Sequence, residues 1–161
     1  MLLFTHPACL AHDPGAGHPE CPARLEAVLH ALRAAYPALP WREAPAASRE
    51  ALRRVHTPAL ISEVLDLATD GPRRLDEDTA MSAGSPDAAL RAAGAGIAAV
   101  DAVMAGESRQ AFCAVRPPGH HAGIDSAGGF CFLNNAAIAA QRLTSRYPRI
   151  VVLDPDMHHG Q

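Results

Sequence analysis

The sequence predicts an α/β domain in which a parallel sheet is flanked by helices. Two short apolar runs, at 111–115 and 149–154, have the composition of buried strands. A Gly-rich loop and a helix that begins near Asn134 separate them, and this order is typical of a βαβ unit with parallel strands covered on both faces. The chain has 161 residues, of which 48% are apolar and 19% charged. That composition is enough to bury the core of one domain.

The N-terminal third predicts one strand, one loop and one helix. Residues 2–6 predict a short strand, and residues 6–19 predict a loop rich in His, Pro and Gly. Pro22 suits the first position of a helix that ends near Tyr36. The apolar face expected for this helix consists of Leu25, Val28, Leu29, Leu32 and Ala35. The Pro-rich stretch 37–46 is expected to be a connection.

Capping residues predict two short helices and then a long one. Ser48 suits the N-cap of a helix that turns Leu52 and Val55 inward, and Thr57–Pro58 suits the start of the next helix, which Gly71–Pro72 ends. The apolar residues of this second helix are Leu60, Ile61, Val64, Leu65 and Leu67.

Residues 73–84 predict a loop, and Ser85–Pro86 begins a long Ala-rich helix that ends near Ala105. The small residues Gly94 and Gly96 within this helix predict very close packing against a neighbouring element, at some cost in helix propensity.

Composition and charge argue against several classes of protein. The net charge is −3 and all 14 basic residues are Arg, so no basic face for nucleic acid is expected. No apolar run approaches the roughly 20 residues of a membrane span, and the N-terminus has no signal peptide pattern. The four cysteines, Cys9, Cys21, Cys113 and Cys131, are expected to be reduced thiols in the cytoplasm.

Two histidine pairs follow the ends of the two predicted parallel strands, where sites form in α/β folds. The second pair lies in LDPDMHHGQ. Asp156 and His158 alternate along extended backbone, so their side chains point to the same side and supply two of the three protein ligands of a catalytic zinc site. Asp154 shares that side and could orient a histidine from a neighbouring strand end. His159 is expected to point away.

The first pair, His120 and His121 in RPPGHHAG, would supply that neighbouring histidine. The motif GGFCF follows and has two interpretations. Its glycines could be turn residues and its aromatics core residues, or Gly129 and Phe130 could form a narrow apolar wall for an extended alkyl chain.

These motifs resemble the histone deacetylase / acetylpolyamine amidohydrolase superfamily, and specifically bacterial members similar to the class II enzymes. The stretches that carry the resemblance are HDPGAGHPECPARLEAV, LRRVHTPALI, GSPDAALRAAGAGIAAVDAVMAG, AVRPPGHHA, GGFCFLNNAAIAA and VVLDPDMHHG. The resemblance implies an arginase/deacetylase-like three-layer fold. It also implies a hydrolase that removes acetyl groups from acetyl-lysine or acetylpolyamines, and it leaves the oligomeric state open. Composition and charge predict no nucleic-acid or membrane partner.

The resemblance also implies catalytic roles. Asp156 and His158 would be zinc ligands, and His121 would be the general base for the attacking water. His120 would be its electrostatic partner, oriented by Asp154.

Three further roles follow from the same resemblance. Gly129 and Phe130 would line the acyl-lysine tunnel, and Arg24 would line an internal channel behind the metal. A potassium ion would be held by backbone oxygens of Asp154, Asp156 and His158.

In the family, the third zinc ligand is an Asp and the group that polarises the amide is a Tyr, and both lie beyond the position of Gln161. Residues 1–161 are therefore expected to be a partial deacetylase domain, the N-terminal half of the fold, cut before the third ligand and inactive alone.

Two alternatives remain at this stage. An arginase-like hydrolase with two manganese ions would need carboxylates near the first histidine pair, where Asp125 is the one candidate. A non-catalytic fragment that requires a partner or the missing half is the other.

Overall fold

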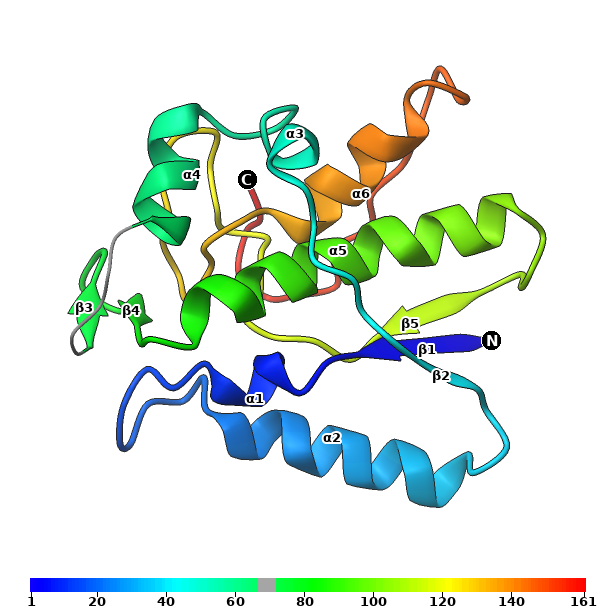
Figure 1. Cartoon of the computed structure of the whole chain (residues 1–161), viewed down its shortest axis with the longest axis horizontal. Helices are drawn as coiled ribbons and strands as arrows, with labels where there is room; N and C mark the ends of the chain where they lie inside the picture. Colours follow the sequence, from blue (N-terminus) through cyan, green and yellow to red (C-terminus); the bar gives the residue numbers. More distant parts are fainter. Residues whose placement is uncertain (67–71) are drawn as a thin grey trace.

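A three-stranded parallel sheet forms the middle of the molecule, in a computed structural model that describes residues 1–66 and 72–161 (Figure 1). Strand β1 (Leu2–Thr5) is central, between β2 (Trp41–Glu43) and β5 (Ala111–Cys113). Both neighbours pair in parallel with β1, so the predicted parallel sheet is confirmed. Parallel pairing requires crossover connections, and helices supply them here.

Helices cover both faces of this sheet, as the three-layer prediction requires (Figure 1). Helix α2 (Pro22–Ala35) packs Leu25 and Leu29 on one side, against the short helix α1 (Ala8–Ala11) and the end of β5. Its start and end are as predicted, but its apolar face is narrower, because Val28 and Ala35 are exposed.

Helix α5 (Ser85–Met104) covers the other face, and its alanines pack on Leu2 and Phe4 of β1. The predicted close packing of its glycines is confirmed. A Cβ at Gly94 would lie 1.9 Å from the carbonyl oxygen of Pro45, and one at Gly96 would lie 3.2 Å from the Cβ of Ala139 in α6 (Asn135–Leu143). Glycine is therefore required where α5 meets the chain that follows β2.

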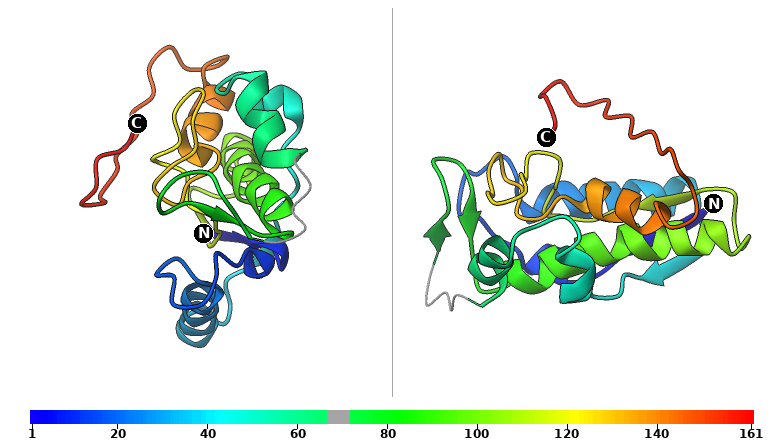
Figure 2. Two further views of the ribbon diagram at one scale, coloured as in Figure 1. Left: turned by 90° about the vertical axis from the view of Figure 1, so that its left-hand side faces the viewer. Right: turned by 90° about the horizontal axis from the view of Figure 1, so that it is seen from above.

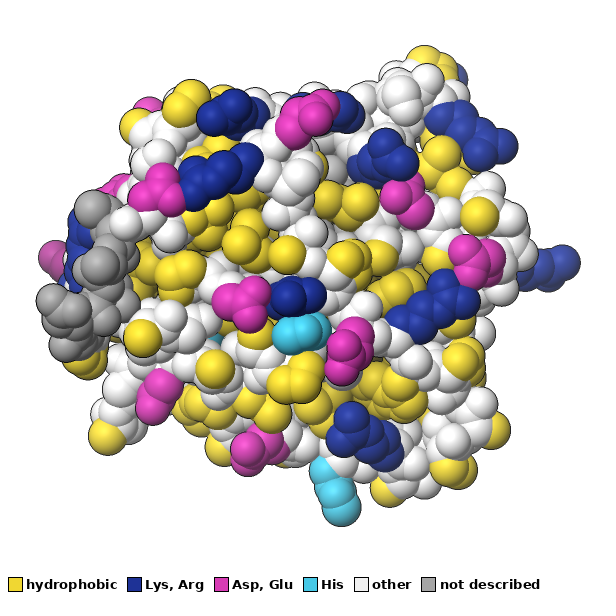
Figure 3. Space-filling view, viewed as in Figure 1, with side chains coloured by type: hydrophobic (Ala, Val, Ile, Leu, Met, Phe, Trp, Pro, Cys, Tyr) yellow, Lys and Arg dark blue, Asp and Glu magenta, His cyan; other side chains and the backbone are white. Residues whose placement is uncertain are grey.

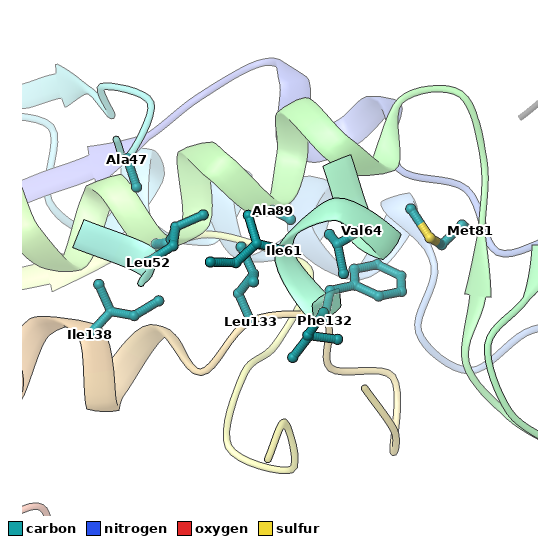
Figure 4. Close-up of a cluster of buried hydrophobic side chains, with 11 residues drawn as sticks. Ala47, Leu52, Ile61, Val64, Met81, Ala89, Phe132, Leu133 and Ile138 are labelled. Atoms are coloured by element: carbon teal, nitrogen blue, oxygen red, sulfur yellow. The ribbon is translucent and has the colours of Figure 1, made fainter. Parts of the chain in front are cut away.

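A second apolar core lies beyond α5, between the predicted short helices and the segment 131–138 (Figure 4). Helix α3 (Arg49–Leu52) begins at its predicted cap, where the Ser48 hydroxyl accepts a hydrogen bond from the Ala51 N–H. Helix α4 (Pro58–Leu65) begins in the same way at Thr57. This core contains residues of α3 and α4 and residues from later in the chain that pack on them: Leu52, Leu60, Ile61, Val64, Met81, Phe132, Leu133 and Ile138. The predicted helical residue Leu67 and the stop at Gly71 lie outside the described residues.

Three segments predicted as loops contain short regular elements. Residues 6–19 contain α1, residues 37–46 contain β2, and residues 73–84 contain the antiparallel pair β3 (Arg73–Arg74) and β4 (Ala80–Met81). Each is two to four residues long, too short for a hydrophobic period to appear. Strand β2 exists because Leu3, Phe4 and Thr5 pair with it from far away in the sequence.

The predicted strand at 149–154 is wrong. This segment makes no strand, and Val151, Val152 and Leu153 are 90%, 58% and 88% exposed. In Figure 2 it runs clear of the helices before the chain returns toward the loop after β5. Its apolar composition suits a strand buried on both faces, but within the described residues it has neither a pairing strand nor a helical cover. Likewise β5 is not fully buried, because Phe112 is 44% exposed.

The surface shows no continuous basic area on the face drawn in Figure 3, where Arg side chains lie among Asp and Glu side chains. Among the described residues, no helix is both long enough and apolar enough to cross a membrane. The cytoplasmic location stays a prediction.

Candidate functional site

The two histidine pairs meet in space, although 36 residues or more separate them in the sequence. Asp154 accepts a hydrogen bond from His120, with 2.8 Å between Oδ2 and Nδ1, which is the pairing expected from the sequence. The backbone N–H of Gln161 donates to the carbonyl oxygen of His120 at 2.8 Å. The ring centroids of His121 and His158 lie 6.0 Å apart. These contacts hold the C-terminal segment against the loop that follows β5.

A cavity of about 430 Å³ lies where they meet. Most of the predicted site residues share its walls, and Asp154 and His159 line a neighbouring cavity that also reaches His120 and His158. The residues that line the first cavity are Pro19, Glu20, Arg24, Asp78, Pro118, His120, His121, Gly129, Phe130, Asp156 and His158.

Asp156 and His158 lie in contact, but through a bend at 157–158 and not through the extended backbone expected from the sequence. The Oδ1 atom of Asp156 lies 3.0 Å from Nδ1 of His158 and accepts the His158 backbone N–H at 2.8 Å. Two ligand atoms of a tetrahedral zinc site lie about 3.3 Å apart, given zinc–ligand distances near 2.0–2.1 Å. The contact between the two side chains is a hydrogen bond, and its length is close to that spacing. Among the described residues, no group of three His, Cys, Asp or Glu side chains is arranged to hold a metal ion.

Both aspartates of this motif are stabilised as carboxylates. The backbone N–H of Asp156, and then the His120 side chain, lower the pKa of Asp154. The backbone N–H and the ring of His158 do the same for the pKa of Asp156. A carboxylate is the form that can accept the His120 hydrogen bond or bind a metal.

Some residues of the motif GGFCF are core residues, and others line the cavity, so each of the two interpretations holds for part of the motif. Phe132 is fully buried in the core, while Gly129 and Phe130 line the cavity beside the histidines. Phe130 has a φ of 68°, which is unusual for a bulky residue. Its N–H donates to the Thr79 hydroxyl at 3.0 Å, and the ring of His18 packs edge-on against it with centroids 4.8 Å apart. The strained turn thus presents an apolar ring to the cavity.

With His121 as the general base that the resemblance implies, Gly129→Ala is expected to lower kcat by about tenfold or more, since catalytic geometry tolerates only displacements well under 1 Å. A Cβ at Gly129 would lie 2.4 Å from Cδ2 of His121, so the imidazole must move. The matched control is Gly106→Ala at the end of α5. Gly106 also has a positive φ, of 77°, but its Cβ would meet nothing within 4 Å. Steady-state kinetics and melting temperatures of both variants separate the steric effect from backbone strain, and equal kcat losses would contradict this expectation.

The structure also contains a buried ion pair that the sequence did not suggest. Glu20 and Arg116 are 1% and 3% exposed, and the guanidinium binds the carboxylate through two hydrogen bonds of 2.7 and 2.6 Å. His12 lies 3.2 Å from the same carboxylate. Arg24, predicted at an internal channel, lies 3.8 Å from Glu20, and its side chain is largely exposed. No local pattern joins residues 96 positions apart, so a single sequence carries no signal for this pair.

This ion pair predicts acid sensitivity. Burial alone would raise the pKa of Glu20, but the hydrogen bonds from His12 and Arg116 outweigh it and lower the pKa to about 2, from 4.5. A carboxyl whose folded pKa is depressed stabilises the protein above its unfolded pKa. That stability is lost as the pH falls from about 4.5 toward 2 and amounts to about 3 kcal/mol.

Urea unfolding between pH 6 and pH 2.5 tests this. We expect Glu20→Gln to be less stable at pH 6 and to show a shallower decline in unfolding free energy below pH 4.5. The control Glu63→Gln breaks a more exposed pair with Arg73, 3.1 Å apart, and should keep the native slope. A native slope in the Glu20 variant would contradict the expectation.

His56 fixes the loop that follows the first histidine pair, by contacts with Gly123 and Asn134. Its Nδ1 lies 2.8 Å from the carbonyl oxygen of Gly123, and its Nε2 accepts the backbone N–H of Asn134 at 2.9 Å. Asn134 in turn caps α6, the helix predicted to begin near it, by accepting the Ala137 N–H. Burial lowers the pKa of His56, and accepting a hydrogen bond at Nε2 requires the neutral ring.

All four cysteines are free thiols, as expected. Burial raises the pKa of Cys113 and of Cys131 to about 11. Cys131 packs beneath the site, where the His121 N–H lies 3.5 Å from its sulfur. Thiols of this kind are inert packing groups rather than nucleophiles.

Comparison with known proteins agrees with this geometry. Residues 18–161 match the sequence family described as the histone deacetylase domain. The "Histone deacetylase-like amidohydrolase" of Pseudomonas aeruginosa is 41% identical over 150 residues, which cover 90% of this chain and 39% of that protein. The "Acetylpolyamine amidohydrolase" of Burkholderia pseudomallei is 58% identical over 74 residues, which cover 46% of this chain and 21% of that protein.

A solved structure shows the same fold. The crystal structure of the HDA15 HD domain superposes with a TM-score of 0.85 at 32% identity, and the match covers 90% of this chain and 44% of that one. The chain thus spans less than half the length of these relatives.

Proposed function

Because the chain belongs to the histone deacetylase family, we propose that the full-length protein is a zinc-dependent amidohydrolase that removes acetyl groups from acetylated lysine or acetylated polyamines. The observation that carries this proposal is the meeting of the His120–His121 pair with the Asp156–His158 pair on one cavity. Acetylpolyamine is the substrate that the name of the Burkholderia relative gives for that protein.

Asp156 and His158 would hold the zinc ion, since their facing atoms already have the spacing of two ligands. A bound zinc ion lowers the pKa of water toward about 7 and polarises an acyl oxygen. A third protein ligand is required for a catalytic site. The backbone oxygens of Asp154, Asp156 and His158 are the proposed ligands of a potassium ion.

His121 would act as the general base. It lines the cavity opposite His158, and its ring nitrogens have no hydrogen-bond partner among the residues that the structure describes. It would take a proton from water as the water oxygen bonds to the acetyl carbon, and the C–N bond then breaks as the amine nitrogen receives a proton. The ring of His120 lies against the ring of His121, with 4.0 Å between their centroids. His120, hydrogen-bonded to Asp154, would stabilise the positive charge that His121 gains with the proton.

The cavity walls support a substrate with an extended alkyl chain that ends in an acetamide. Gly129 and Phe130 form the apolar wall, and Asp78 adds a carboxylate to the lining. Arg24 lines the same cavity, so the lining carries charge of both signs. The proposal therefore extends both to neutral acetyl-lysine side chains and to cationic acetylpolyamines.

A mononuclear site is supported over an arginase-like pair of metals. A second ion would need free carboxylates near the first histidine pair, and Asp125 is exposed and absent from the cavity lining. Of the two carboxylates in that lining besides Asp156, Glu20 is bound by Arg116, and Asp78 belongs to no group of three potential ligands among the described residues. Counting metal ions per protein by elemental analysis tests this, and two bound ions would overturn it.

The activity test uses the full-length protein with a fluorogenic acetyl-lysine peptide and with N-acetylputrescine. We expect release of acetate that is lost after dialysis against a chelator and restored by zinc. Acetate release that persists without metal, or its absence with zinc and both substrates, would contradict the proposal.

A further inference from the structure

The buried guanidinium of Arg116 binds five acceptors in a fixed arrangement, one of them the backbone oxygen of Glu20 at 3.4 Å. Besides the two carboxylate oxygens of Glu20, Nη1 donates to the backbone oxygens of Cys9 and His12, at 2.7 and 2.5 Å. The planar fork of an Arg side chain can satisfy these acceptors together, whereas Lys presents a single point charge.

Glu20 connects this arrangement to two more segments. His12 lies 3.2 Å from its carboxylate, and the other ring nitrogen of His12 lies 2.7 Å from the hydroxyl of Ser85, the first residue of α5. The network therefore joins the loop around α1, the start of α2, the start of α5 and the loop after β5. Breaking a fully buried pair leaves one charge without a partner, which is costly.

Arg116 lies four residues before His120, so the network fixes the chain that leads to the histidine pair. Glu20 lines the same cavity as both histidines. The far end of this loop is fixed by His56, whose Nδ1 lies 2.8 Å from the Gly123 carbonyl oxygen. At the near end, beside Arg116, Asn135 also donates to the carbonyl oxygen of Pro117 at 3.3 Å. The loop is thus held at both ends, and the buried charges hold only one of them.

From this geometry we propose that Arg116 and Glu20 are positioning residues for the His120–His121 pair, the inference resting on the proposed function where it concerns catalysis. They do not touch the reacting atoms. They set where His120 meets Asp154 and where His121 faces the cavity, so their loss affects turnover more than substrate binding.

Arg116→Lys in the full-length protein is the main test. This substitution keeps the positive charge but removes the planar guanidinium that binds several acceptors at once. We expect kcat, normalised to the folded fraction, to fall by about tenfold or more, with KM within about twofold, as for a displaced catalytic group. The second variant, Glu20→Gln, should show the same fall in kcat with KM nearly unchanged. If Glu20→Gln does not fold, Glu20→Asp is measured in its place. The control Arg142→Lys alters an exposed pair with Asp101, 2.8 Å apart, and should match the native protein.

An NMR measurement tests the positioning without any activity. The His120 Nδ1–H that faces Asp154 should give a resonance that shifts or is lost in Arg116→Lys and is unchanged in Arg142→Lys. Unchanged His120 resonances, or a kcat loss that only follows the folded fraction, would overturn the proposal. If the native protein deacetylates neither substrate, the proposed function fails, while the His120 resonance still decides whether Arg116 positions the pair.

Discussion

Replacing His121 with alanine is expected to lower kcat of the full-length protein by at least about 100-fold, the usual contribution of a positioned base. His121 faces His158 across the cavity at 6.0 Å between ring centroids, and a Cβ at Gly129 would collide with its ring. The imidazole therefore lies in a fixed place at the wall of the cavity, where water and an acyl group would meet. KM should change little, because the alkyl wall of Phe130 is untouched.

The rate should be measured across pH 5–9. Because a general base must be deprotonated to act, kcat of the native protein should fall at the acidic end of this range. His30→Ala, on the exposed side of α2, is the matched control and should retain native turnover. His120→Gln keeps a polar group near Asp154 and should show a smaller loss than His121→Ala. Native kcat in His121→Ala would remove this residue from the proposed mechanism.

The parts of the site that could be predicted depend on local spacing. Asp156 and His158 are two residues apart, so their 3.0 Å contact is local, but it forms where the chain bends at 157–158 and not through the extended backbone that the sequence predicted. The caps at Ser48, Thr57 and Asn134 are also local, since the partner is three residues away. Such contacts need no knowledge of the rest of the fold.

The parts that could not be predicted depend on distant pairing. Arg116 and Glu20 are separated by 96 positions, and each looks like an ordinary loop charge in the sequence. Strand β2 has three residues and gains its structure from pairing with β1. Conversely, segment 149–154 has the composition of a strand, but composition cannot supply the neighbouring strand and helices that would bury it.

Removing either proposed ligand is expected to abolish tight zinc binding by the full-length protein. Asp156→Asn and His158→Ala each delete one of only three protein ligands that a catalytic zinc site uses. Loss of a group that merely supports a ligand already costs about 10–100-fold in metal affinity, so loss of a ligand should cost more. We expect about one zinc ion per native protein after dialysis and well under a tenth of that in each variant.

His159→Ala is the matched control, because His159 adjoins His158 and, although it lines the neighbouring cavity with Asp156 and His158, it is not one of the proposed ligands. The sequence predicts that the side chain of His159 points away from the metal, so this variant should retain native zinc. Elemental analysis gives the zinc content, and thermal unfolding with and without a chelator reports the same site independently, since a ligand that binds only the folded state raises its stability. Full zinc content in Asp156→Asn or His158→Ala, or loss of zinc in His159→Ala alone, would show that the metal is held by other residues.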